Sequence, residues 1–73
     1  MPRLVIKDTA LVKVLTKHYG FYIYGRHGSH VKFRDDKGHT VIVSIHNEDV
    51  KQGTLNAILR QSGLEKSDIL KYV

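Results

Sequence analysis

A glycine, a serine and a histidine stand together at Gly28-Ser29-His30, between two runs of residues typical of strands. An imidazole exchanges protons near neutral pH, so His30 is a candidate general acid or base. Glycine permits a positive φ or the close approach of a phosphate, and the Ser29 hydroxyl can donate a hydrogen bond to one. Further side chains around the motif are basic: Arg26, His27, Lys32 and Arg34. This combination indicates acid–base chemistry on RNA, whose phosphates the basic groups would hold.

Each of these residues also has a simpler interpretation. His30 alone is compatible with an exposed strand histidine, Ser29 with a turn residue, and a single basic residue with a solvated charge. His27 and His30 have the spacing of a metal-binding pair, but no third ligand is nearby and the chain has no cysteine, which argues against zinc. We therefore expect no metal and no cofactor. For a second proton-transfer group, His27 and Lys32 are the nearest candidates.

Charge is distributed unevenly along the 73-residue chain, whose formal net charge is +5. Residues 1–34 contain seven Lys or Arg and one acid, whereas residues 35–73 contain five and six. The basic half includes the glycine–serine–histidine motif, which favours an anionic partner such as a nucleic acid. We expect a single domain over 1–73, with a modest core that self-association would supplement. No apolar run approaches the roughly 20 residues of a membrane span and no signal-peptide pattern is present, so we expect a cytoplasmic protein.

The hydrophobic pattern predicts a helix before the motif and three strands around it. Leu11, Val14 and Leu15 recur at helical spacing, which predicts a helix over 9–19 with Asp8 or Thr9 as its N-cap. Alternating and β-branched residues then predict strands, separated by a loop and a hairpin turn. The strands are expected over 21–24, 30–34 and 40–45, the loop over 25–29 and the turn over 35–38.

Two helices are predicted after a polar loop over 46–53. The first covers about 54–62, with Gly63 in the position after its end, where glycine accepts a positive φ. The second covers 65–73. The residues expected to face the core are Leu55, Ile58 and Leu59 from the first helix, and Ile69, Leu70 and Val73 from the second.

This order predicts an α+β fold in which the helices cover one face of a three-stranded antiparallel sheet. Val31 and Phe33 then face the helices, whereas the alternate residues His30, Lys32 and Arg34 lie on the other face. The loop leaves the side of Tyr22 and Tyr24 undetermined. These tyrosines are either packing residues or surfaces on which unpaired bases stack.

Taken in order, these motifs resemble the HicA family of toxins, small mRNA interferases of type II toxin–antitoxin systems. The resemblance extends from about Asp8 to Val73 and rests on four segments at matching spacing. The segments are the helix over 11–19 with its Gly20-Phe21 exit, Gly28-Ser29-His30, Val43-Ser44-Ile45-His46, and the block over 51–64.

The resemblance implies a double-stranded-RNA-binding-domain-like fold and cleavage of mRNA without a metal cofactor. It also implies that His30 is the catalytic histidine and that a HicB-type antitoxin covers the active site. Three positions depart from the family pattern: Gly25 and Asn56 replace common basic residues, and Ser44 replaces a common proline. The two lost basic residues would weaken RNA contacts, and no departure removes His30.

Two other functions are compatible with the sequence. A non-catalytic RNA-binding module would use the same basic surface, with His30 only as a contact. A protein-interaction module would show no salt-dependent affinity for RNA. Replacement of His30 separates the ribonuclease from the binding module, because only the ribonuclease loses cleavage.

Overall fold

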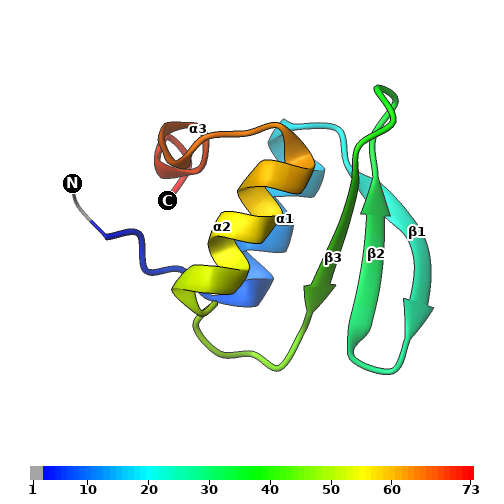
Figure 1. Ribbon diagram of the computed structural model, residues 1–73, viewed down its shortest axis with the longest axis horizontal. Coiled ribbons are helices and arrows are strands. Elements are labelled where there is room, and N and C mark those ends of the chain that lie inside the picture. Colours follow the sequence, from blue (N-terminus) through cyan, green and yellow to red (C-terminus); the bar gives the residue numbers. More distant parts are fainter. Residues whose placement is uncertain (1–2) are drawn as a thin grey trace.

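The computed structural model describes residues 3–73, which form three helices and one three-stranded sheet (Figure 1). The helices are α1 (Asp8–His18), α2 (Gln52–Ser62) and α3 (Lys66–Leu70), and the strands are β1 (Tyr22–His27), β2 (His30–Arg34) and β3 (Thr40–Ser44). Both strand pairs are antiparallel, in the order β1-β2-β3. The predicted α+β, double-stranded-RNA-binding-domain-like fold is confirmed. Within the described residues, no helix is long and apolar enough to cross a membrane.

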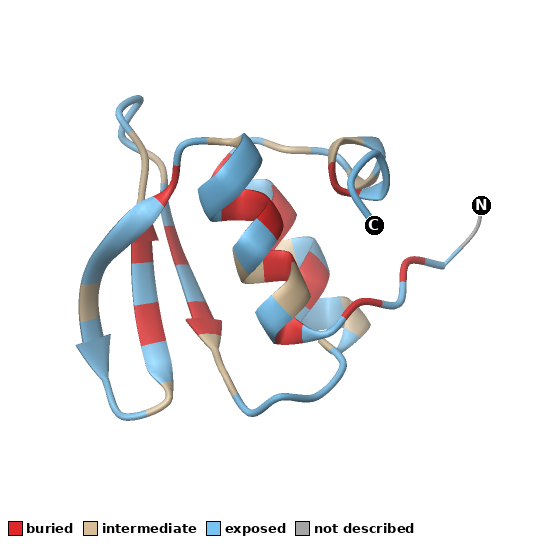
Figure 2. Ribbon diagram, turned by 180° about the vertical axis from the view of Figure 1, so that it is seen from behind, coloured by how far each residue is buried: buried red, intermediate tan, exposed pale blue. Residues whose placement is uncertain are grey.

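The core lies between the sheet and the two long helices, which both contact β3 (Figures 1 and 2). Side chains of β2 and β3 alternate between buried and exposed, as expected for a sheet covered on one face. The helices supply apolar residues at helical spacing. The buried side chains include Val31, Phe33, Val41 and Val43 from the sheet and Leu11, Val14, Leu15, Leu55, Ile58 and Leu59 from the helices. The predicted inner faces of β2 and α2 are therefore confirmed.

Strand β1 is longer than the sequence predicts. The expected loop over 25–29 is wrong, because Gly25, Arg26 and His27 continue the strand and pair with β2. The register shifts between Ile23 and Gly25, which leaves Tyr24 as the extra residue of a β-bulge. Glycine is a poor strand former that often marks a bulge, so the pairing with β2 holds this segment extended against its local preference.

Asp8 does not cap α1, so its predicted role and that of Thr9 are wrong. The helix begins at Asp8, and its N-cap residue, Lys7, makes no side-chain capping bond. The Asp8 side chain is buried, and its Oδ2 accepts hydrogen bonds from the backbone N–H groups of His46 at 2.7 Å and Glu48 at 3.4 Å. Burial alone raises the pKa of Asp8, but the backbone donors outweigh it and hold the pKa below 3.8. A charged carboxylate therefore anchors the loop after β3 to the start of α1.

The C-terminal helix α3 ends at Leu70, before the predicted end at Val73. Ile69 is buried as expected. Leu70 and Val73 are 45% and 64% exposed, so the prediction that they face the core is wrong. Because so short a helix buries little apolar surface, a polar contact also attaches it: the Tyr19 hydroxyl donates a hydrogen bond to the Asp68 carbonyl at 2.7 Å.

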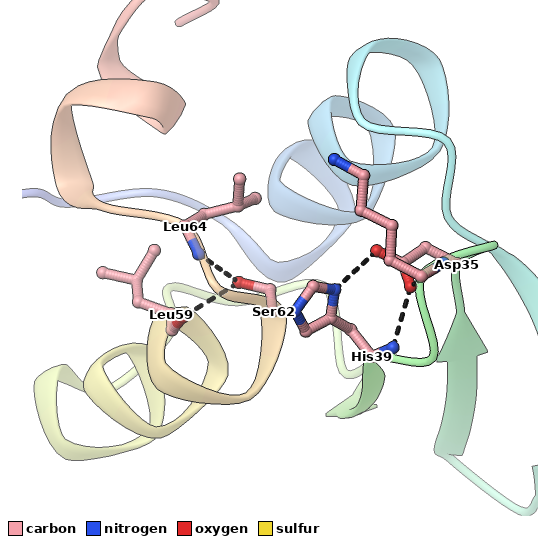
Figure 3. A network of polar contacts seen from close by, with 6 residues as sticks. Asp35, His39, Leu59, Ser62 and Leu64 are labelled. Carbon is pink, nitrogen blue, oxygen red and sulfur yellow. Dashed lines mark hydrogen bonds and ion pairs between the residues drawn. The ribbon is translucent and has the colours of Figure 1, made fainter.

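The turn between β2 and β3 contacts the end of α2 (Figure 3). The Asp35 carboxylate accepts the His39 backbone N–H at 2.8 Å and pairs with the His39 ring at 2.7 Å. Burial raises the pKa of Asp35, but these bonds to His39 hold it below 3.8. Gly63 follows α2 with a φ of 74°, as predicted, and a Cβ there would lie 2.9 Å from His39 Nε2. Only glycine therefore lets the turn and the helix end approach this closely.

Replacement of Asp8 by Asn is expected to lower the free energy of unfolding at pH 7 by about 1–3 kcal/mol, because the backbone N–H groups of His46 and Glu48 lose a charged acceptor. A lowered folded-state pKa stabilises the protein at pH values above the unfolded-state pKa. This stabilisation is lost as the pH falls through the folded-state pKa, so the difference between the two proteins shrinks in acid. Urea unfolding measured from pH 7 down to pH 3 tests this.

Asp36→Asn is the matched control, because it is the same chemical replacement at an exposed aspartate. Equal destabilisation by the two substitutions would show that Asp8 does not anchor the loop.

Candidate functional site

A two-residue turn, Gly28-Ser29, joins β1 to β2 and sets His27 opposite His30. Gly28 has a φ of 62°, and tight hairpin turns require such a positive φ at their first central position. The Ser29 carbonyl accepts a hydrogen bond from the Ile45 N–H at 2.8 Å, so the pairing of β2 with β3 extends into the turn. The glycine–serine–histidine motif therefore lies in a short turn that is tied to the neighbouring strand.

The sheet face away from the helices carries most of the candidate residues. Val31 and Phe33 point toward the helices, so His30, Lys32 and Arg34 point to the opposite face, as predicted. Directly opposed residues of antiparallel strands share a face, so the register places their partners there too. We define the open face as Tyr22, Tyr24, His27, His30, Lys32, Arg34, Thr40, Ile42 and Ser44. It contains basic and aromatic side chains and no carboxylate.

His27, His30 and Ser44 form one row across the three strands at one end of the open face. Opposed residues in an antiparallel pair have Cβ atoms about 4.5–5.5 Å apart. Both histidines are exposed, and Ser44 is half-buried. Two imidazoles at this spacing, open to solvent, are within reach of a single phosphodiester group.

The bulge in β1 brings Tyr24 onto the open face. The Arg34 guanidinium carbon lies 4.7 Å from the centre of the Tyr24 ring, a cation–π contact. Tyr22 is the cross-strand partner of Arg34 and shares its face. The two tyrosine side chains are 48% and 59% exposed, so the core does not use them. Exposed rings beside a guanidinium form a surface on which a nucleobase can stack.

Arg26 does not lie on the same face as His30. It pairs with Val31, which points toward the helices, so the Arg26 side chain leaves β1 on the helix side. Because β1 is the strand farthest from the helices in Figure 1, this side of the strand is uncovered: Arg26 is exposed and Ile23 is 59% exposed. The structure thus brings His27, Gly28, Ser29 and Lys32 close to His30, places Arg34 on the same face at the other end of β2, and directs Arg26 to the helix side of β1.

Sequence reasoning did not assign Ile42 or Asp8 to the site. Ile42 is the partner of Lys32 and is 45% exposed, and the alternation of residues along β3 is the signal that could have placed it on the open face. Asp8 fixes the backbone of His46, which follows the Ser44 end of the histidine row. No local signal marks this role, because the Asp8 carboxylate and the His46 backbone N–H that donates to it are 38 residues apart in the chain.

Metal ligands do not gather on this surface. Over residues 3–73, no group of three or more His, Asp or Glu side chains is arranged to hold a metal ion. The polar groups that the open face offers are two imidazoles, the charged ends of Lys32 and Arg34, and the hydroxyls of Thr40, Ser44 and the two tyrosines.

The fold and the open face define a small basic α+β domain whose exposed sheet surface carries paired histidines. The family model described as the HicA toxin of bacterial toxin–antitoxin systems matches residues 9–64, which is most of the chain. The chain therefore belongs to the HicA toxin family, and it is expected to have an antitoxin partner. No curated protein matches the sequence. The matched range contains all three strands and so the whole open face.

Replacement of Gly28 by Ala is expected to lower the free energy of unfolding by about 1–2 kcal/mol, the cost of a left-handed conformation for a residue with a Cβ. No atom lies within 4 Å of a Cβ at this position, so the expected cost is conformational and not steric. Gly53→Ala is the control, because Gly53 lies within α2 at an equally open position without a positive φ. Alanine favours a helix, so urea unfolding should show Gly53→Ala unchanged or more stable. A Gly28→Ala protein as stable as wild type would contradict the turn geometry.

Proposed function

We propose that this HicA-family toxin is an endoribonuclease, an mRNA interferase that cleaves RNA without a metal cofactor. The observation that supports this most is the placement of His30 on an open, carboxylate-free sheet face, directly beside His27 and next to Lys32. A histidine in this setting can transfer protons to or from a bound polyanion. Two of the four HicA-like segments, Gly28-Ser29-His30 and Val43-Ser44-Ile45-His46, meet at one end of this surface, where Ser44 pairs with His30.

In the proposed reaction, His30 acts as a general acid or base on the scissile phosphodiester. A base is needed to take the proton of the attacking 2′-hydroxyl, and an acid to protonate the departing 5′-oxygen. A positioned group in either role contributes typically 10²–10⁴-fold to the rate. Lys32 stabilises the charge that develops on the phosphate oxygens, and Gly28 lets the phosphate approach the backbone of the turn.

RNA binding is proposed to run along β2 from the histidine row to the tyrosines. Arg34 lies four positions after His30, which corresponds to about 13 Å of strand. Tyr22 and Tyr24 would therefore stack on a base farther along the RNA, and not on the two bases that flank the cleaved bond. Lys32 and Arg34 hold phosphates without reading the base sequence. Further phosphate contacts come from His27, from the Ser29 hydroxyl and from Arg26 on the edge strand. Stacking on exposed rings requires unpaired bases, which favours single-stranded mRNA as the substrate.

The antitoxin partner is proposed to be a HicB-type protein that covers the open face. An inhibitor that blocks cleavage sterically must cover His30, and acidic or phosphate-like groups would complement Lys32 and Arg34. Because the proposed substrate is mRNA, both proteins would act in the cytoplasm.

A non-catalytic RNA-binding module is the second candidate function. The contact between Tyr24 and Arg34 favours it, because an aromatic and guanidinium surface binds bases without any chemical step. In this case the same open face binds RNA, and His30 is one contact among several.

Replacement of His30 by Ala is expected to lower the rate of RNA cleavage by at least about 10²-fold, because a proton-transfer group is lost. The assay uses purified protein, a single-stranded RNA and EDTA, and circular dichroism verifies the fold of each variant. His18→Ala is the matched control, since His18 is an exposed histidine at the end of α1 and outside the open face. Equal cleavage by wild type and His30→Ala would contradict the proposal. RNA binding without cleavage by either protein would favour the binding module.

Replacement of Lys32 by Gln is expected to weaken RNA binding and to reduce its salt dependence. Each phosphate contact to a single strand contributes about 0.7 to the slope of log affinity against log salt, so the slope should decrease by about this amount. Fluorescence anisotropy with His30→Ala protein avoids cleavage during the titration. Lys13→Gln provides the comparison, because Lys13 is an exposed lysine on α1. A larger effect from Lys13→Gln would place RNA on the helix side of the molecule.

A further inference from the structure

We propose that His27 is the second proton-transfer group, so that His27 and His30 divide the roles of general acid and general base. This inference rests on the proposed endoribonuclease function. A metal-independent phosphodiester cleavage has two proton transfers, and His30 can perform only one of them in the forward direction. The structure supplies a second imidazole at the position directly opposed to His30.

The turn holds the two imidazoles at a defined spacing. His27 and His30 flank the two-residue turn as its closing pair, which gives Cβ atoms about 4.5–5.5 Å apart on one face of the sheet. The turn is constrained by the positive φ of Gly28 and by the hydrogen bond from the Ile45 N–H to the Ser29 carbonyl. The attacking and departing oxygens lie on opposite sides of the phosphorus. Two rings at this separation can contact one of these oxygens each.

Other titratable or charged groups near the pair are poorer candidates. Arg26 adjoins His27 but leaves β1 on the helix side, and a guanidinium does not deprotonate in proteins. Lys32 lies two residues from His30 on the same face, where its charge suits the phosphate oxygens. From β3, Ser44 faces His30 and offers only a hydroxyl. His46 follows this row, but its backbone is held by Asp8 and it has no partner position opposite either histidine.

The proposed step balances without any further reactant. One neutral imidazole takes the 2′-hydroxyl proton while the 2′-oxygen forms a bond to phosphorus and the bond from phosphorus to the 5′-oxygen breaks. The other imidazole, protonated at the start, gives its proton to the 5′-oxygen. The products are a 2′,3′-cyclic phosphate and a 5′-hydroxyl, and proton exchange with water restores the two histidines.

This division of roles predicts a bell-shaped pH dependence of kcat, since one ring must be neutral and the other protonated. Cleavage of a short RNA oligonucleotide would be followed from pH 5 to pH 9 for wild type, His27→Gln, His30→Gln and His46→Gln. His27→Gln is expected to lose about 10²-fold or more in kcat and one side of the bell, with RNA affinity changed far less. His46→Gln is expected to keep both sides. Thermal unfolding verifies that each variant is folded.

A second substrate assigns the acid. In an RNA with sulfur in place of the scissile 5′-oxygen, the leaving thiolate needs no protonation, because a thiol is far more acidic than an alcohol. Only one of the two variants, His27→Gln or His30→Gln, should regain cleavage on this substrate. The inference is overturned if His27→Gln keeps the complete bell and cleaves within about threefold of wild type, if His46→Gln loses a side of it instead, or if neither variant is rescued by sulfur. If His30→Gln cleaves RNA at the wild-type rate, the proposed function itself is refuted.

Discussion

The alternation of side chains along β2 connects the stability of this protein to its candidate site. Val31 and Phe33 are almost fully buried under α1 and α2, and the residues between them are forced to the opposite side. A one-residue change in register would move His30 into the core and Phe33 into solvent. The hydrophobic effect that holds the two layers together therefore also fixes the direction in which His30 and Lys32 point.

Polar contacts hold both ends of the sheet that carries this alternation. At one end, the Asp8 carboxylate binds the backbone after β3, next to the histidine row. At the other end, Asp35 and His39 shape the turn after β2 where it meets Gly63 (Figure 3). Neither contact lies on the open face. The sheet surface can therefore remain exposed and polar, while the register that orders it is set by contacts on the helix side and at the ends.

The elements with strong local signals were predictable from the sequence. Strict alternation over 30–34 identified β2 and both of its faces, and Gly63 identified the end of α2. The continuation of β1 through Gly25 was not predictable, because glycine disfavours strands and only the pairing with β2 overrides that preference. The short α3 was overestimated because Leu70 and Val73 are apolar, and local pattern does not reveal where a terminal helix stops packing.

The same distinction applies to the candidate site. His30, Lys32 and Arg34 were placed on one face from alternation alone, whereas the facing of His27 and Tyr24 depends on a bulge and a tight turn. Arg26 shows that closeness in sequence does not place a residue in the site: it is near His30 in the chain, yet it pairs with Val31 and therefore points to the other side of β1. Neighbouring residues of a strand point to opposite faces, and a bulge such as the one at Tyr24 shifts that alternation by one residue.

The most direct test of the central claim is to map where RNA contacts the wild-type protein. An ¹⁵N-labelled sample titrated with a single-stranded RNA methylated at every 2′-oxygen would bind without being cleaved, because the attacking hydroxyl is blocked. If RNA binds the open face, backbone amide shifts change there, at His27, His30, Lys32 and Ser44, and remain unchanged on the exposed side of α1. Shifts confined to α1 or α2 would contradict the claim, because the histidine row would then face away from the nucleic acid.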